Sequence, residues 1–217
     1  MRIREPLALT LTLIALLGTA ERADAEIVDR VMAVVGSQVV TLSDVRAAET
    51  FDLVPSVTRW TAAGTVAYLV ERQLMLSEVE RYSAPDPDRA LLDRRLAQIR
   101  AGFPTSADYD RALARTAMSD ARLRNLVVDN LRIESYLDQR FGAAAQPTQD
   151  EVQRYYREHP AEFTQNGRLA PFDEVQQAAQ QKAAAERRRA LIADWLDRLR
   201  RRGQVELLYA APVTGIR

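Results

Sequence analysis

The chain of 217 residues contains no cysteine and only one histidine, His159. Without cysteine there are no disulfides, no thiolate metal sites and no cysteine nucleophiles. One histidine also excludes metal sites and catalytic arrangements that need two histidines from one chain. His159 precedes Pro160 near the expected end of a helix, where a structural role is the simpler interpretation. We therefore expect no metal site and no cofactor.

An excess of charge of either sign is missing as well, because 30 basic residues balance 30 acidic ones. Affinity for nucleic-acid backbones depends on an excess of Lys and Arg, so no nucleic-acid partner is expected. Phosphate-binding loops and hydrolase motifs are absent from the sequence. Adjacent carboxylates such as Asp150 and Glu151 fall at expected helix starts, where capping accounts for them. The sequence does not predict an enzyme.

Long apolar runs are missing except near the N-terminus. Arg2 and Arg4 precede an apolar run over Leu7–Leu17, and Ala23-Asp24-Ala25 forms an A-x-A cleavage pattern. This arrangement is typical of a secretory signal peptide, here residues 1–25. No later run is long enough to span a bilayer. The remaining chain is therefore expected to be exported, soluble and without a stable membrane span.

Apolar residues make up 47% of the chain, enough for a globular core. Residues 27–42 are rich in β-branched side chains around Gly36-Ser37 and predict a β-hairpin. Thr41 and Asp44 can then cap a first helix that ends near Val54-Pro55. Helical periodicity and Pro or Gly breaks predict the next helices at about Thr58–Arg81, Asp86–Ala101, Ala107–Ala117 and Ser119–Phe141.

A break at 142–147 divides the expected domain, residues 26–210, into a part over 26–147 and a part over 148–210, followed by a tail over 211–217. Thr148 begins a helix that Pro160 must bend or end, and Thr164–Ala170 is expected to be a polar loop. A long helix over Pro171–Arg202 and a strand over Val205–Tyr209 follow. Because an isolated hairpin is marginal in water, this strand is predicted to pair with the N-terminal hairpin. The expected fold is mostly α, with a small hairpin joined by the C-terminal strand.

Four segments resemble the N-terminal module of SurA-like, parvulin-type periplasmic folding factors. They are the hairpin Val28–Val45, the helical stretch Leu69–Leu76, and the segments Arg132–Asp138 and Thr148–Tyr156. Each is built from common residues, and their order makes the resemblance specific. It extends from about Val28 to Tyr209. The resemblance implies a SurA N-terminal-like helical domain, a periplasmic location and a role in protein folding.

The family's isomerases carry a parvulin domain between the two segments that correspond here to Phe163 and Pro171. Only Thr164–Ala170 separates these residues, which is too short for a domain of that kind. The sole histidine lies before this gap. The parvulin-type peptidyl-prolyl isomerase domain is therefore expected to be absent.

The resemblance implies ATP-independent, chaperone-like binding of unfolded or extended segments of exported proteins, outer-membrane proteins above all. Adaptable aromatic and Met side chains are the candidates for such a peptide-binding groove, although helical spacing also fits core positions for most of them. The candidates are Tyr68, Met75, Phe103, Tyr109 and Met118. Two alternatives stay open: an adaptor that binds one specific envelope or secretion partner, and a residual prolyl isomerase. The sequence leaves the oligomeric state open.

Overall fold

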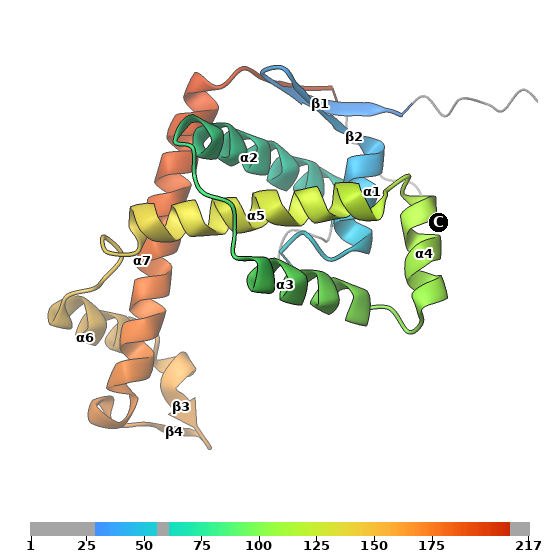
Figure 1. The fold of residues 1–217 in the computed structure, drawn as a ribbon. Coiled ribbons are helices and arrows are strands. Elements are labelled where there is room, and N and C mark those ends of the chain that lie inside the picture. The colour runs from blue at the N-terminus through green and yellow to red at the C-terminus, as the bar shows by residue number, and fades with distance from the viewer. Residues whose placement is uncertain (1–28, 56–60, 209–217) are drawn as a thin grey trace, which may run out of the picture.

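The computed structural model describes residues 29–55 and 61–208. The predicted signal peptide, the end of the last predicted strand at Tyr209 and the tail lie outside these residues. The described chain is mostly helical, with a small antiparallel sheet along one side of the helices (Figure 1). Within this part of the chain, no helix is both long and apolar enough to cross a membrane.

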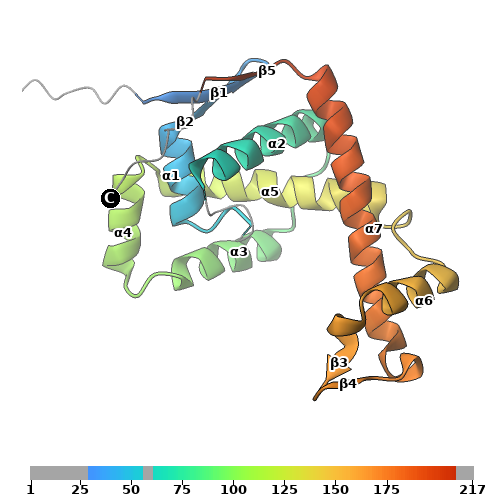
Figure 2. The ribbon, with the colours of Figure 1, turned by 180° about the vertical axis from the view of Figure 1, so that it is seen from behind.

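The sheet has three strands in the order β2-β1-β5. Strands β1 (Val31–Val35) and β2 (Gln38–Thr41) form the predicted hairpin, and Gly36 takes a φ of +59° in its turn, where glycine is favoured. Strand β5 (Val205–Leu207) pairs antiparallel with the other edge of β1. Figure 2 shows β5 beside β1, so the predicted pairing of the C-terminal strand with the N-terminal hairpin is confirmed.

Helices α1 (Leu42–Thr50) and α2 (Ala62–Arg81) follow the hairpin. The Thr41 hydroxyl accepts from the Asp44 amide, and the Asp44 carboxylate accepts from the Thr41 amide, so α1 starts with a capping box as predicted. It ends at Thr50, earlier than the predicted end near Val54-Pro55. Helix α2 begins four residues after the predicted Thr58, because Thr61 is extended and its hydroxyl caps the Gly64 amide at 3.0 Å.

Three helices of the middle of the chain each begin directly after a capping side chain. Asp88 precedes α3 (Arg89–Ala101), Thr105 precedes α4 (Ser106–Arg115) and Ser119 precedes α5 (Asp120–Phe141). The predicted start of α3 at Asp86 is too early, because Asp88 is the cap. The three helices otherwise follow the predicted order and spacing.

The last third of the chain contains α6 (Gln149–Glu158), a 3-10 turn (Pro160–Phe163) and the long helix α7 (Phe172–Arg202). The segment predicted as a polar loop instead forms a hairpin of β3 (Thr164–Gln165) and β4 (Arg168–Leu169). Asn166 and Gly167 at its tip both have positive φ. Asn-Gly with positive φ at both positions is the preferred two-residue hairpin turn, a signal present in the sequence.

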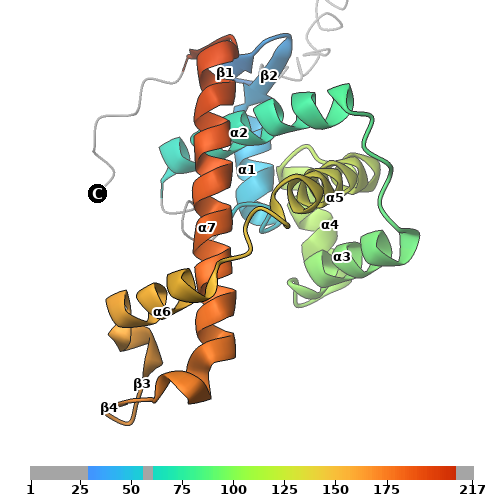
Figure 3. The same cartoon turned by 90° about the vertical axis from the view of Figure 1, so that its left-hand side faces the viewer.

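Helix α7 belongs to two regions (Figure 3). Its C-terminal half packs in the main core with the sheet, α2 and α5, where Trp195 is 2% exposed. Its N-terminal half packs against α6 and the 3-10 turn in a separate core with Val152 and Phe163 at the centre. We call α6, the 3-10 turn, β3, β4 and residues 172–183 of α7 the end unit, and the remaining described residues the helical body.

Candidate functional site

The helical body contains a groove of about 620 Å³ between α2, α3, α5 and residues 52–55, which we call the helix groove. Its volume lies in the range of roughly 300–1,000 Å³ that is usual for ligand sites. Apolar side chains form much of its lining. They include Leu53, Val54, Met75, Ile99, Leu131 and Leu137.

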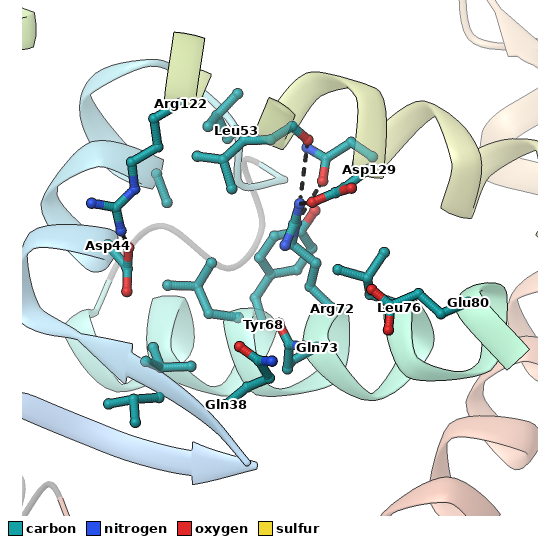
Figure 4. Close-up of a pocket in the computed structure, with 16 residues that line it drawn as sticks. Gln38, Asp44, Leu53, Tyr68, Arg72, Gln73, Leu76, Glu80, Arg122 and Asp129 are labelled. Carbon is teal, nitrogen blue, oxygen red and sulfur yellow. Dashed lines mark hydrogen bonds and ion pairs between the residues drawn. The ribbon is translucent and has the colours of Figure 1, made fainter. Parts of the chain in front are cut away.

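A second cavity of about 280 Å³ lies between β2, α1, α2 and α5, and we call it the sheet pocket (Figure 4). Its apolar lining includes Val40 of β2, Leu69 and Leu76 of α2, and Leu126 of α5. Strand β2 is an edge strand of the three-stranded sheet. The sheet pocket therefore borders a sheet edge as well as a pair of helices.

The helix groove and the sheet pocket share four lining residues, which we call the shared wall: Leu53, Tyr68, Arg72 and Asn130. Arg72 ties α2 to α5 within this wall. Its Nε donates to Oδ1 of Asn130 at 2.6 Å, and its Nη2 donates to the Leu126 carbonyl at 3.2 Å and to Oδ2 of Asp129 at 3.3 Å. These bonds fix the guanidinium at the junction of the two cavities.

Charged pairs lie at the rims of both cavities. Arg122 binds Asp44 at 2.7 Å beside the sheet pocket, and Arg95 binds Glu134 at 3.3 Å beside the helix groove. Tyr68, which lines both cavities, is half-buried, and burial raises the pKa of its phenol. Tyr68 therefore stays protonated at neutral pH and can donate a hydrogen bond. The two cavities together form a double cavity, whose lining combines apolar side chains with a polar centre and polar rims.

The structure separates the five sequence candidates into two places. Tyr68 and Met75 both lie on α2 and line the helix groove, and Tyr68 also lines the sheet pocket. Met75 is 8% exposed and takes part in the main core as well. These two candidates belong to the double cavity.

The other three candidates gather around Phe51 in a second core. The rings of Phe103 and Tyr109 lie 5.7 and 6.0 Å from the Phe51 ring, and the Tyr109 hydroxyl donates to Asp120 at 2.7 Å. Met118 is 6% exposed in the same cluster. Phe103 and Tyr109 also line a surface cavity of about 510 Å³ beside the α3–α4 connection, which is separate from the double cavity in its lining residues.

Sequence reasoning missed Arg72 and Leu53. A signal for the polar centre was present, since Asn130 interrupts the apolar stripe of α5 and Arg72 lies among the apolar residues of α2. Two polar residues on apolar helix faces indicate a buried hydrogen bond between helices. Nothing in the spacing pairs Arg72 with Asn130, because 58 positions separate them.

His159 has structural partners at the end of α6. Its ring stacks on Tyr155 at 4.1 Å, and its Nδ1 lies 3.0 Å from the Tyr155 carbonyl oxygen. Across residues 29–55 and 61–208, no group of three or more His, Cys, Asp or Glu side chains could hold a metal ion. The geometry therefore assigns no ligand to this histidine.

No family model and no curated protein matches the chain. A solved structure does match, from the work on the virulence factor PEB4 and the periplasmic protein Cj1289 of Campylobacter jejuni, described as two structurally related SurA-like chaperones. The match has a TM-score of 0.51 at 13% sequence identity, and it covers 83% of this chain and 100% of that chain. The chain has a SurA-like fold. At this identity the SurA-like match describes the arrangement of the helices and the sheet, in agreement with the predicted fold class.

Proposed function

We propose that this chain is an ATP-independent chaperone that binds unfolded or extended segments of exported proteins in the periplasm. The observation that carries the proposal is the double cavity in the helical body of this SurA-like fold. Its apolar lining can take apolar side chains from an unfolded chain, and its polar centre and rims can meet the polar backbone that comes with them. Burial of these side chains supplies affinity without nucleotide.

Outer-membrane proteins are the client class that we propose. Their strands alternate between apolar and polar residues, and the apolar faces stay exposed until insertion. An extended segment of that kind offers apolar side chains at every second position, and the edge strand β2 beside the sheet pocket offers backbone pairing. The proposed periplasmic location rests on the predicted signal peptide and on the likeness to the SurA-like chaperones.

We also propose that the chain has no prolyl isomerase activity. The support is the short connection between Phe163 and Pro171, where β3 and β4 form a hairpin in place of a domain. A proline-limited refolding assay tests this point. Catalysis of refolding by the purified chain would contradict it.

The main test is aggregation of a denatured outer-membrane protein after dilution, with and without the purified chain from residue 26 onward, in the absence of nucleotide. We expect suppression at near-stoichiometric ratio. Replacing Tyr68 with Ala removes a half-buried ring from the shared wall and should weaken client binding about tenfold. Tyr82→Ala is the matched control, because Tyr82 is 60% exposed and lines neither cavity.

A lack of suppression at excess protein would overturn the proposed function. Equal loss in the Tyr68→Ala and Tyr82→Ala variants would place binding elsewhere on the surface. Circular dichroism of both variants checks that each keeps its helical content.

A further inference from the structure

The guanidinium of Arg72 is only partly used by its own protein. The side chain is 10% exposed and lines both cavities. Its Nε and Nη2 bind α5, whereas Nη1 has no hydrogen-bond partner among the described residues. Among the described residues, only one side-chain nitrogen or oxygen is fully buried and also lacks a hydrogen-bond partner, Nε of Arg132. Nη1 of Arg72 also lacks a partner and is not such an atom, so it remains accessible to solvent.

A second free donor lies one helical turn earlier on the same face of α2. The hydroxyl of Tyr68 has no hydrogen-bond partner among the described residues, and the Tyr68 ring lines the same two cavities. In Figure 4 the dashed lines from Arg72 lead only toward α5, and the Tyr68 ring lies beside the Arg72 side chain. Among the described residues, the shared wall therefore presents two donor groups that lack an acceptor, Nη1 of Arg72 and the Tyr68 hydroxyl, where the two cavities meet.

The charged residues that line the two cavities indicate which kind of acceptor Arg72 and Tyr68 can bind. Arg72 and Arg122 are the basic residues of the sheet pocket, and three acidic residues offset them: Asp44, Glu80 and Asp129. In the helix groove, Asp52 and Glu134 likewise balance Arg72 and Arg95. An incoming carboxylate would meet these acidic side chains, whereas a neutral carbonyl oxygen would accept from the donors without repulsion.

We propose that Arg72 and Tyr68 form a backbone anchor, in which Nη1 and the phenol hydroxyl donate to a main-chain carbonyl of a bound extended segment. Successive side chains of an extended chain point to opposite sides. The side chains that flank the anchored carbonyl then enter the helix groove and the sheet pocket. The inference rests on the proposed function. It adds how the position of the client segment in the site is chosen: a neutral backbone carbonyl binds the anchor, and the apolar side chains on its two sides enter the two cavities.

The test measures binding of a fluorescently labelled peptide of alternating tyrosine and serine, acetylated and amidated so that it carries no carboxylate. Tyr68→Phe keeps the ring and removes only the hydroxyl, and it should weaken binding about fivefold, the effect of one lost hydrogen bond. Tyr82→Phe is the matched control and should bind as the wild type does. Arg72→Lys retains the charge and loses the planar fork, and it should weaken binding at least as much as Tyr68→Phe.

The outcomes separate this inference from the proposed function. If the wild type binds the peptide and Tyr68→Phe and Arg72→Lys bind it equally well, the anchor is wrong and the chaperone function stands. If a peptide with glutamate in place of serine binds more tightly than the neutral one, the site selects carboxylates and the neutral-acceptor assignment is wrong. If the wild type binds neither peptide nor denatured client, both proposals fail. Because the buried Arg72 supports the fold, Tyr68→Phe remains the decisive variant if Arg72→Lys lowers the helical content.

Discussion

The helical body and the end unit use the same helix in different ways. In the body, Trp195 and Leu199 of α7 pack against strands and helices that are distant in the sequence. In the end unit, Val175 and Ala179 pack against α6 and the 3-10 turn, which only the β3–β4 hairpin separates from α7 in the chain. Among the residues that the structure describes, the main core holds 17 buried residues and the end-unit core holds six. A region with a small core and local contacts opens at lower free energy, so we expect the end unit to open on its own.

The candidate site also lies apart from the connection between Phe163 and Pro171, where the parvulin-type isomerases that the sequence resembles carry an extra domain. Every described residue that lines the double cavity belongs to the body, from β2 through α5. The end unit contributes no lining residue to it. The proposed client binding is therefore expected to survive changes that open the end unit.

Replacing large core side chains with Ala should give the largest effects on stability and should distinguish the helical body from the end unit. Trp195 and Phe163 are each 2% exposed, so replacing either with Ala should cost about 3–5 kcal/mol in its own region. Trp195→Ala lowers the free energy of global unfolding, because its ring joins α7 to Tyr136 and Phe141 of α5. Phe163→Ala opens only the end unit. Chemical denaturation measures the loss of global stability in Trp195→Ala, and hydrogen exchange of the α6 amides measures the opening of the end unit in Phe163→Ala.

The control for this pair is amide protection in β1. Protection there should drop in Trp195→Ala and stay unchanged in Phe163→Ala. Equal loss of β1 protection in both variants would show that the two cores unfold as one unit.

A matched pair of glycines should give an intermediate effect. Gly36 and Gly167 occupy hairpin turns at φ of +59° and +77°, and a Cβ added to either meets nothing within 4 Å. Replacement by Ala therefore adds only backbone strain, about 1–2 kcal/mol. Gly36→Ala should lower global stability, since its hairpin belongs to the main sheet. Gly167→Ala should raise exchange only around β3 and β4.

If Gly167→Ala lowers the midpoint of global unfolding as much as Gly36→Ala does, the end unit is not independent. Circular dichroism during urea unfolding is sufficient to compare the two midpoints.

A fall in pH should give the smallest effect on stability, and the effect should be confined to the end unit. The Lys182 ammonium, 2.6 Å from Glu162, holds the pKa of that carboxyl below its ordinary value of 4.5. A lowered folded pKa means that the stabilisation is present above pH 4.5 and is lost as the pH falls through the folded value. We therefore expect amides in α6 and the 3-10 turn to lose protection below pH 4.5, measured as the exchange rate relative to the intrinsic rate at each pH. The hydrogen bond from the Thr148 amide lowers the pKa of Glu151 and adds to the same trend.

Glu162→Gln is the control, because it removes the titrating group and retains an oxygen that can accept from Lys182. Amide protection in this variant should depend less on pH than in the wild type. An unchanged pH dependence would assign the effect to other carboxylates.

Local signals in the sequence account for much of the fold. Capping residues and Pro or Gly breaks located the helices to within a few residues, and the pairing of β5 with β1 followed from the instability of an isolated hairpin. The errors are local as well. The start of α2 depended on which of several Thr residues caps the helix, and the Asn166-Gly167 turn was overlooked although its signal lay in the sequence.

The candidate site was less accessible from the sequence. Tyr68 and Met75 line the double cavity, whereas Phe103, Tyr109 and Met118 belong to a second core around Phe51. Aromatic and Met side chains at helical spacing fit a core and a groove equally well, because periodicity reports which face is buried and not what covers it.

The sequence by itself determined the order of the helices, the hairpin and the resemblance to SurA-like proteins, because capping, periodicity and turn chemistry are local properties. Tertiary structure alone decided that Arg72 of α2 meets Asn130 of α5, and that two cavities share the wall formed around this contact. It also decided that α7 serves two cores. Such features depend on distances between residues far apart in the chain, which no local pattern encodes.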